Sequence, residues 1–414
     1  MAQRTITKGK FMRLIFLFFI MVFSLQAQNA QIVEKFTDPK ACSQCHNSQY
    51  SMWKTSVHAL SHEKNNELFA KSAKLVSIDS FQTYEQTLVG CSNCHNPRLD
   101  VKNVSSNYVL AKTFELNTKE TEYVDSSLKV KHIQNGISCY ICHNVDSIKP
   151  RDDDSQIGYQ NFNWVNGDII VGPFDDEHQR GKEFHLSYKR DFFKENNNLC
   201  LSCHQGKGGK SEHSVYNTGH ELINSGSTEL CANCHMGKEG REIISPNIEP
   251  DNAVFRKTRP HLFSSVRNNP TILSNALDID INQIDDKTAK VSVINKIAHN
   301  MPSGFSGRSL ELNLTFYDKN SKILDDQKLS FEKRYRSKTG FTTLSYSAEV
   351  MDSDTTLKPN ESREFEVVFP KGTSTIKAKL NYYLIQPELQ KRLLVKDESF
   401  TKTYPVLERE LKIK

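Results

Sequence analysis

Cys42-Ser43-Gln44-Cys45-His46 is the stretch that decides how this chain folds, because its pattern occurs five times. The other four copies are Cys91-Ser92-Asn93-Cys94-His95, Cys139-Tyr140-Ile141-Cys142-His143, Cys200-Leu201-Ser202-Cys203-His204 and Cys231-Ala232-Asn233-Cys234-His235. Each copy has two cysteines separated by two residues, and a histidine follows directly. Together the copies contain all 10 cysteines of the 414-residue chain.

This spacing suits covalent haem attachment. Thiols three residues apart lie on the same side of a helical turn, so each can form a thioether with one vinyl group of the same haem, while the next imidazole ligates the iron. Zinc sites need two cysteine pairs per metal, and disulfides do not require histidine at a fixed offset. We therefore predict five covalent haems c. The predicted attachment residues are Cys42, Cys45, Cys91, Cys94, Cys139, Cys142, Cys200, Cys203, Cys231 and Cys234, and the predicted proximal iron ligands are His46, His95, His143, His204 and His235.

The motifs are closely spaced along the chain. Cys42 to His235 is 194 residues, or about 39 per motif, whereas a globin wraps eight helices around one haem. The haems must then share walls, which permits fast electron hopping between them. Porphyrin surface also explains why hydrophobic residues make up only 37% of the chain.

The first 27 residues have the pattern of an export signal. Four basic residues precede a 12-residue apolar run at 14–25, and Ala27 ends a plausible cleavage site. The run is shorter than the approximately 20 apolar residues of a membrane span. We predict a signal peptide at 1–27, a periplasmic location and no integral membrane span in the mature chain, with an uncleaved anchor as the alternative.

Net charge gives no sign of nucleic-acid binding. The formal charge is +5, but the chain after residue 27 has 50 basic against 49 acidic residues. Five ferric haems with ionised propionates would bring the total to −4. We expect no nucleic-acid partner and predict that the partners are periplasmic or membrane redox proteins.

The segment after the first motif resembles a known family. Tyr50, Trp53, Ser56, His58 and Ala59 follow Cys42 at spacings similar to the opening of the cytochrome c-552/c-554-type multihaem cytochromes. The resemblance implies that His58 is a distal haem ligand, and the alternative is a surface histidine. The spacing also predicts one helix from Cys42 to Ala59.

Three later segments add to this resemblance. They are Gly172-Pro173-Phe174 with Phe184-His185, then His261-Leu262-Phe263, and then His299-Asn300-Met301-Pro302-Ser303-Gly304. The last is similar to a G-H-x-x-P-T-G loop of the family, with Ala298 and Ser303 as departures. The resemblance implies distal ligands at His185, His261 and His299. His178 is a rival to His185 without family support.

The pattern of apolar residues divides the chain. Residues 60–90 predict helices, and 100–132 predict a long excursion or a short hairpin. After about residue 275 apolar residues alternate with period 2, as in Leu277/Ile279/Ile281 and Leu310/Leu312/Leu314/Phe316. About seven strands are expected there. The predicted fold is a two-domain α+β chain: a pentahaem domain at 28–245, mainly helical or irregular, a linker with a haem ligand at 246–275, and an antiparallel β-sandwich at 276–414.

Two functions are possible, and they depend on what occupies the sixth coordination position of each iron. If a second histidine fills it, the iron only exchanges electrons; if it stays open, the iron can bind nitrite, hydroxylamine or a sulfur compound. The four family-like histidines leave one haem without an assigned distal ligand, and His132, His213 and His220 are the candidates. We favour an electron carrier with no catalytic residue over an oxidoreductase, because the chain has no C-x-x-C-K motif. A haem filament formed by self-assembly is a third hypothesis.

Overall fold

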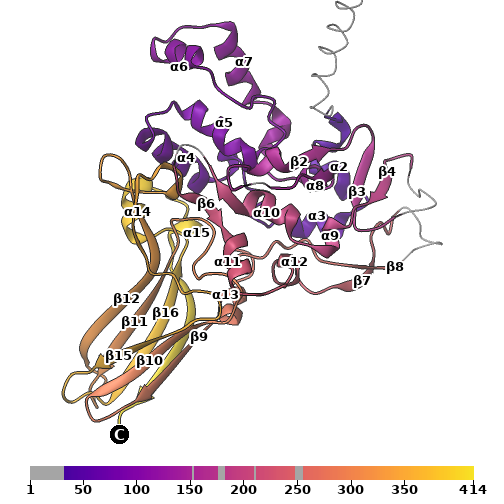
Figure 1. The fold of residues 1–414 in the computed structure, drawn as a ribbon. Helices are drawn as coiled ribbons and strands as arrows, with labels where there is room; N and C mark the ends of the chain where they lie inside the picture. Colours follow the sequence, from indigo (N-terminus) through magenta and orange to yellow (C-terminus); the bar gives the residue numbers. More distant parts are fainter. Residues whose placement is uncertain (1–31, 152, 176–181, 209–210, 248–254) are drawn as a thin grey trace, which may run out of the picture.

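The computed structural model describes residues 32–151, 153–175, 182–208, 211–247 and 255–414. The predicted signal peptide and His178 lie outside the described residues. Figure 1 shows short helices in the N-terminal part and long strands in the C-terminal part. The two-part α+β architecture is therefore confirmed.

The N-terminal part consists of short helices and four two-stranded sheets, β1–β2, β3–β4, β5–β6 and β7–β8; only β3–β4 is parallel. The helices are η1 (Glu34–Phe36), α2 (Pro39–Ser43), α3 (Asn47–Trp53), η2 (Glu63–Asn65), α4 (Glu67–Asp79), α5 (Tyr84–His95), α6 (Ser106–Thr113), α7 (Lys119–Ser127), η3 (Lys131–Asn135), α8 (Cys139–Cys142), η4 (Gly158–Asn161), α9 (Phe192–Glu195), α10 (Asn198–His204), α11 (Thr218–Asn224) and α12 (Cys231–His235). The strands are β1 (Val145–Ile148), β2 (Phe162–Trp164), β3 (Ile169–Gly172), β4 (Leu186–Lys189), β5 (Gln205–Lys207), β6 (Ser214–Asn217), β7 (Gly240–Ile243) and β8 (Phe255–Thr258). Within the described residues, no helix has the length and apolar character needed to cross a bilayer.

Helices α4 and α5 begin at side-chain caps, which is why the 60–90 prediction is confirmed. The Asn66 side chain accepts from the Phe69 N–H at 3.0 Å, and the Thr83 side chain accepts from the Gln86 N–H at 3.1 Å. Such caps satisfy N–H groups that have no partner within the helix.

Two local predictions are wrong. The expected helix from Cys42 to Ala59 is interrupted after α2 and ends with α3 at Trp53. The Trp53 indole N–H donates to the Ile137 carbonyl at 2.8 Å, and the backbone continues in turns. The alternative of a short hairpin in 100–132 is replaced by helices α6 and α7, which Figure 1 shows projecting from the rest.

The C-terminal part contains two antiparallel sheets. One has the order β15-β10-β9; the other has the order β13-β12-β11-β16-β17, with β14 also paired to β12. The strands are β9 (Leu277–Gln283), β10 (Thr288–Asn295), β11 (Ser309–Tyr317), β12 (Ile323–Arg336), β13 (Thr342–Thr343), β14 (Val350–Asp354), β15 (Ser362–Val368), β16 (Thr375–Tyr383) and β17 (Tyr404–Lys412), accompanied by α13 (Thr271–Ala276), η5 (Ser345–Ser347), α14 (Pro387–Leu393) and α15 (Glu398–Thr401).

The alternating apolar residues of both sheets share one core. Leu277 and Val291 from the smaller sheet and Leu312, Phe316 and Leu380 from the larger sheet are fully buried in the same cluster. The strands predicted from this alternation are therefore present. Strand β12 has 14 residues, most of them partly or fully exposed, so its sequence carries little of the period-2 signal that predicted the others.

A buried ion pair joins the two parts. Asp79, the last residue of α4, accepts two hydrogen bonds from the Arg392 guanidinium of α14, at 2.9 and 3.0 Å. The Thr343 hydroxyl of β13 donates to the same carboxylate at 2.6 Å. Leu75 and Val76 of α4 also belong to the core cluster of the sheets. The C-terminal sheets therefore pack directly on the helices that precede the second motif.

Candidate haem centres

The motifs lie on short helical turns. The second, fourth and fifth motifs end helices α5, α10 and α12, and the third occupies α8 with His143 as its C-cap. The first motif spans the end of α2, and His46 is the N-cap of α3. This helical geometry turns the two thiols of one motif to the same side, as a thioether pair requires.

Four motif histidines each face a second histidine. The ring-centre separations are 6.3 Å for His46–His185, 6.2 Å for His143–His261, 6.1 Å for His204–His58 and 6.4 Å for His235–His299. Metal–imidazole bonds are about 2.0–2.1 Å long, so two imidazoles on opposite sides of one metal have ring centres about 6 Å apart. The four second histidines are those that the family resemblance had indicated. The spacing fits one iron between the two rings of each pair.

In six of the histidines, namely four from the motifs and two that face motif histidines, the ring nitrogen Nδ1 lies within hydrogen-bond distance of a backbone carbonyl. The Nδ1–O distances are 3.1 Å for His46 to Ile244, 3.0 Å for His95 to Ser61, 2.7 Å for His143 to Val171, 3.1 Å for His235 to Ser264, 3.2 Å for His261 to Arg259 and 2.9 Å for His299 to Asn300. A carbonyl can only accept, so Nδ1 must carry the proton. Nε2 is then left with its lone pair for a metal.

Burial also favours neutral imidazoles. It lowers the pKa of His58 to about 4, that of His261 to about 4 and that of His204 to about 3. Neighbouring histidines contribute to each of these lowered pKa values, after burial. A neutral imidazole is the form that ligates iron, so the lowered pKa values suit these histidines to a role as iron ligands.

His95 differs from the other motif histidines. Its ring stacks on Phe69 of α4, with ring centres 4.1 Å apart and planes within 2° of parallel. Because the two rings are stacked, Phe69 lies against the face of the His95 imidazole. Phe69 does not lie on the opposite side of an iron bound by that imidazole. Among the described residues, no histidine ring is recorded opposite His95 at the spacing of the four pairs.

The three candidates for the fifth distal ligand are placed elsewhere. His213 has an edge contact with Tyr335 at 5.4 Å between ring centres. His220 is half exposed, and its Nε2 lies 2.8 Å from the Asp154 carboxylate. His132 lines a small pocket between the second and third motifs. The structure therefore pairs none of them with His95.

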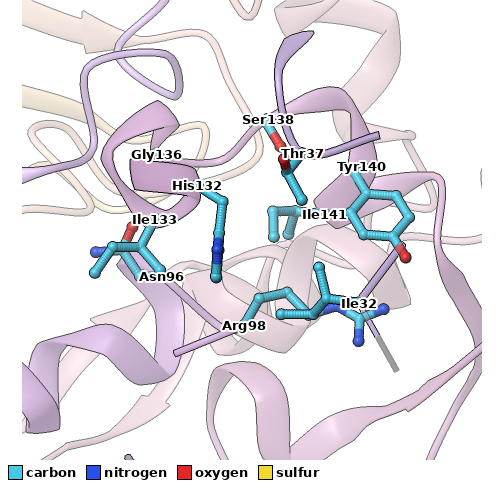
Figure 2. Close-up of a pocket in the computed structure, with 10 residues that line it drawn as sticks. All are labelled: Ile32, Thr37, Asn96, Arg98, His132, Ile133, Gly136, Ser138, Tyr140 and Ile141. Carbon is cyan, nitrogen blue, oxygen red and sulfur yellow. The ribbon is translucent and has the colours of Figure 1, made fainter. Parts of the chain in front are cut away.

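Figure 2 shows His132 and Arg98 directed into this pocket. The Arg98 guanidinium lies over the Trp164 ring, 3.8 Å from its centre, and burial lowers its pKa to about 10. Tyr140 of the third motif also lines the space. The pocket thus brings a buried cation beside the segment that carries the third motif.

Thiols of different motifs also lie in contact. A hydrogen bond to the Cys42 thiol, together with burial, raises the pKa of Cys139, and Cys200 is affected in the same way by Cys231. Cys94 and Cys203 form a third such pair. Contacts therefore join the first motif to the third, the second to the fourth and the fourth to the fifth. Haems attached at these motifs would have neighbouring edges.

Some residues of the site could not be found from the sequence. Phe69 is one aromatic residue among many in the 60–90 helices. Tyr216, partly buried and with its ring centre 5.2 Å from that of His204, lies in a short strand without a motif. The carbonyl acceptors are backbone groups, which residue type does not reveal. Only the cysteine and histidine spacings gave a usable signal.

Comparisons with known proteins agree with this geometry. Residues 41–144 match the family described as "Cytochrome c554 and c-prime". The chain is similar in fold to a penta-heme cytochrome c552 from Thermochromatium tepidum, with a TM-score of 0.69 and 19% identity over 90% of this chain and 97% of that one. A β-glucuronidase from Bacteroides uniformis aligns with a TM-score of 0.17 and 12% identity over 34% of this chain and 13% of its own, which is too low to carry an argument. No curated protein matches the chain. The motifs, the family match over residues 41–144 and the shared fold all support a resemblance to the multihaem cytochromes c.

Proposed function

We propose that the chain binds five haems c covalently at its five motifs and conducts electrons along them. The observation that carries this proposal is the set of four imidazole pairs at 6.1–6.4 Å. Bound haem supplies one-electron redox chemistry. His46 with His185, His143 with His261, His204 with His58 and His235 with His299 would be the axial pairs. With both axial positions filled, these centres exchange electrons without binding substrate.

The chain's own residues would keep the centres close and their ligands fixed. The thiol contacts between motifs favour neighbouring haem edges, as electron hopping requires. The backbone carbonyls hold the imidazoles in one tautomer and one orientation, which limits the rearrangement that accompanies each electron transfer. Other periplasmic or membrane redox proteins would supply and remove the electrons.

The export signal at 1–27 and the periplasmic location belong to the same proposal, because bacterial c-type haems are attached outside the cytoplasm. We also propose the division into a haem domain at 28–245, a linker at 246–275 that carries His261, and a β-sandwich at 276–414. The sandwich is supported by two antiparallel sheets that share one core.

A second function has one specific observation in its favour. His95 stacks on Phe69 and has no recorded histidine opposite it among the described residues. A haem held by His95 would then have an open sixth position, at which a small nitrogen or sulfur compound could be reduced or oxidised.

The test is the holoprotein produced in a host that attaches haems c. We expect the mature chain to carry the covalent mass of five haems, and its ferric electron paramagnetic resonance spectrum to show four low-spin centres and one high-spin centre. Fewer than five haems, or a failure of His299→Ala to reduce the low-spin signal, would refute the assignment. Spectral changes on adding nitrite, hydroxylamine or cyanide would favour the second function, and unchanged spectra would exclude it.

A further inference from the structure

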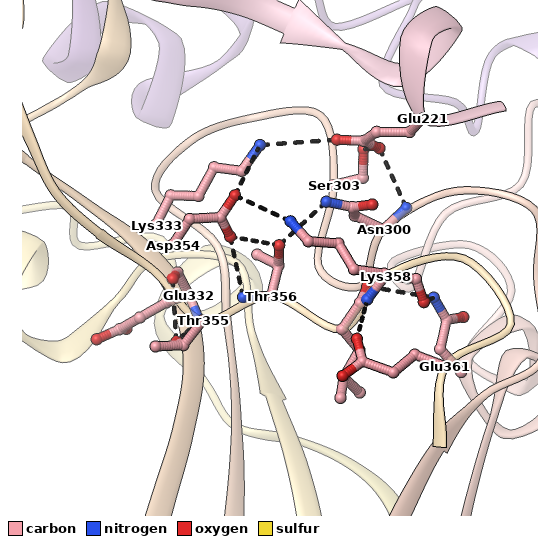
Figure 3. A network of polar contacts seen from close by, with 12 residues as sticks. Glu221, Asn300, Ser303, Glu332, Lys333, Asp354, Thr355, Thr356, Lys358 and Glu361 are labelled. Carbon is pink, nitrogen blue, oxygen red and sulfur yellow. Dashed lines mark hydrogen bonds and ion pairs between the residues drawn. The ribbon is translucent and has the colours of Figure 1, made fainter. Parts of the chain in front are cut away.

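Glu221 is a buried carboxylate that reaches from the N-terminal part with the five motifs (the haem region) to the C-terminal sheets (the sheet region). It lies on α11, between the fourth and fifth motifs, and its side chain is only 4% exposed. One carboxylate oxygen accepts the Asn300 N–H at 3.2 Å and the Ser303 hydroxyl at 2.5 Å. The other lies 3.6 Å from the Lys333 ammonium group. Figure 3 shows these contacts converging on Glu221.

The hydrogen-bonded partners of Glu221 belong to the loop that carries His299. Asn300 follows His299 directly, and Ser303 lies in the same loop. The buried Asn295 side chain donates to the His299 carbonyl at 2.8 Å, and the Asn300 side chain donates to the Thr356 hydroxyl at 3.1 Å. Glu221 therefore ties this loop to α11, together with a longer contact of 3.4 Å between the Thr218 and Ser303 hydroxyls.

Two cations lie near the contacts of Glu221. Lys333 lies between Glu221 and Asp354, 4.0 Å from the Asp354 carboxylate. Arg308 donates to the Ser303 carbonyl at 2.8 Å on the other side of the loop. Asn300, Ser303 and Lys333 each offer the Glu221 carboxylate a hydrogen-bond donor or a positive charge, and such partners offset the cost of burying a carboxylate.

We propose that Glu221 is a positioning residue for His299 and that its fixed negative charge lowers the reduction potential of the centre between His235 and His299. This inference rests on the proposed function, because it requires iron between those two rings. The oxidised centre carries one more positive charge than the reduced centre. A nearby carboxylate therefore stabilises the oxidised form, and Glu221 would make this centre a poorer electron acceptor than it would be beside a neutral side chain.

The experiment is a spectroelectrochemical titration of the five-haem holoprotein, combined with electron paramagnetic resonance. In Glu221→Gln the amide oxygen can still accept from Asn300 and Ser303, so we expect all low-spin signals to remain. A one-electron component out of five should move to higher potential. Lys333→Gln removes the paired cation and should move the same component to lower potential. The matched control is Glu212→Gln, because the Glu212 side chain is 93% exposed and lies 3.6 Å from the Lys207 ammonium group.

Glu221→Ala separates positioning from charge. It removes the oxygen that accepts both hydrogen bonds from the His299 loop, and we expect part of one low-spin signal to become high-spin, whereas Glu221→Gln should keep that signal low-spin. If Glu221→Gln titrates like Glu212→Gln, or if Glu221→Ala keeps every low-spin signal, the inference is wrong. Those outcomes differ from a failure of the proposed function, in which His299→Ala itself would leave the low-spin signals unchanged.

Discussion

Replacing Asp79 by Asn tests whether the buried ion pair holds the sheets to the haem region. The Asp79 side chain is 2% exposed, and that of Arg392 is 24% exposed. Removing one partner of a buried pair destabilises a protein by about 3–5 kcal/mol. The Asn amide oxygen can still accept one bond, and Arg392 remains partly exposed to solvent, so we expect a loss just below this range, about 2–3 kcal/mol.

The assay is guanidinium unfolding of the holoprotein, followed by far-ultraviolet circular dichroism and by haem absorbance. The matched control is Asp278→Asn, because Asp278 meets Arg409 at the same 2.9 Å but with side chains 37% and 46% exposed. An exposed pair contributes about 0–1 kcal/mol, so the control should unfold nearly like the wild type. Equal losses of unfolding free energy in the two variants would refute the reasoning that burial decides the cost.

Two further predictions concern the haem region. Burial lowers the pKa of Lys102 from 10.5 to about 8. The unfolded chain therefore binds more protons between these pH values, so wild-type stability should rise by about 2–3 kcal/mol from pH 8 to 10.5 relative to Lys102→Met; parallel pH profiles of unfolding free energy in the two proteins would contradict this. A Cβ on Gly158, which has φ +65°, would lie 1.8 Å from the Asn93 carbonyl oxygen inside the second motif. We expect mass spectrometry to find one haem fewer in Gly158→Ala. The control Gly226→Ala should carry the full number, because φ is +70° there and nothing lies within 4 Å. A full number of haems in Gly158→Ala would contradict the prediction, because it would show that the second motif can shift to relieve the contact.

Much of the haem region could be predicted because its chemistry requires fixed residue types at fixed spacing. The motif residues and the four histidines that face them were all found from such patterns. The end of the helix at Trp53 could not be predicted, because it depends on a hydrogen bond from the Trp53 indole to the distant Ile137 carbonyl. The placement of Phe69 against His95 depends in the same way on tertiary packing.

The sheet region shows the same limit. Strands β9, β10, β11, β15 and β16 were visible in the sequence because one side of each is buried. Strand β12 is held by backbone pairing with β11 while most of its side chains meet solvent, so alternation does not reveal it. The position of Glu221 beside the His299 loop brings together residues 79 positions apart, and no local pattern encodes such a meeting.

The carbonyl groups that hold the motif imidazoles have a consequence for biosynthesis. The acceptor for His46 is Ile244, 198 residues further along the chain, and the acceptor for His143 is Val171, 28 residues further along. A nascent chain that emerges from its N-terminus could therefore acquire its first porphyrin long before the imidazole below it has a fixed orientation. The imidazole of the third motif would be held by its carbonyl before that of the first motif, although the histidine that faces it, His261, lies further along the chain. The order in which the motif imidazoles are fixed need not follow the order in which the motifs are synthesised.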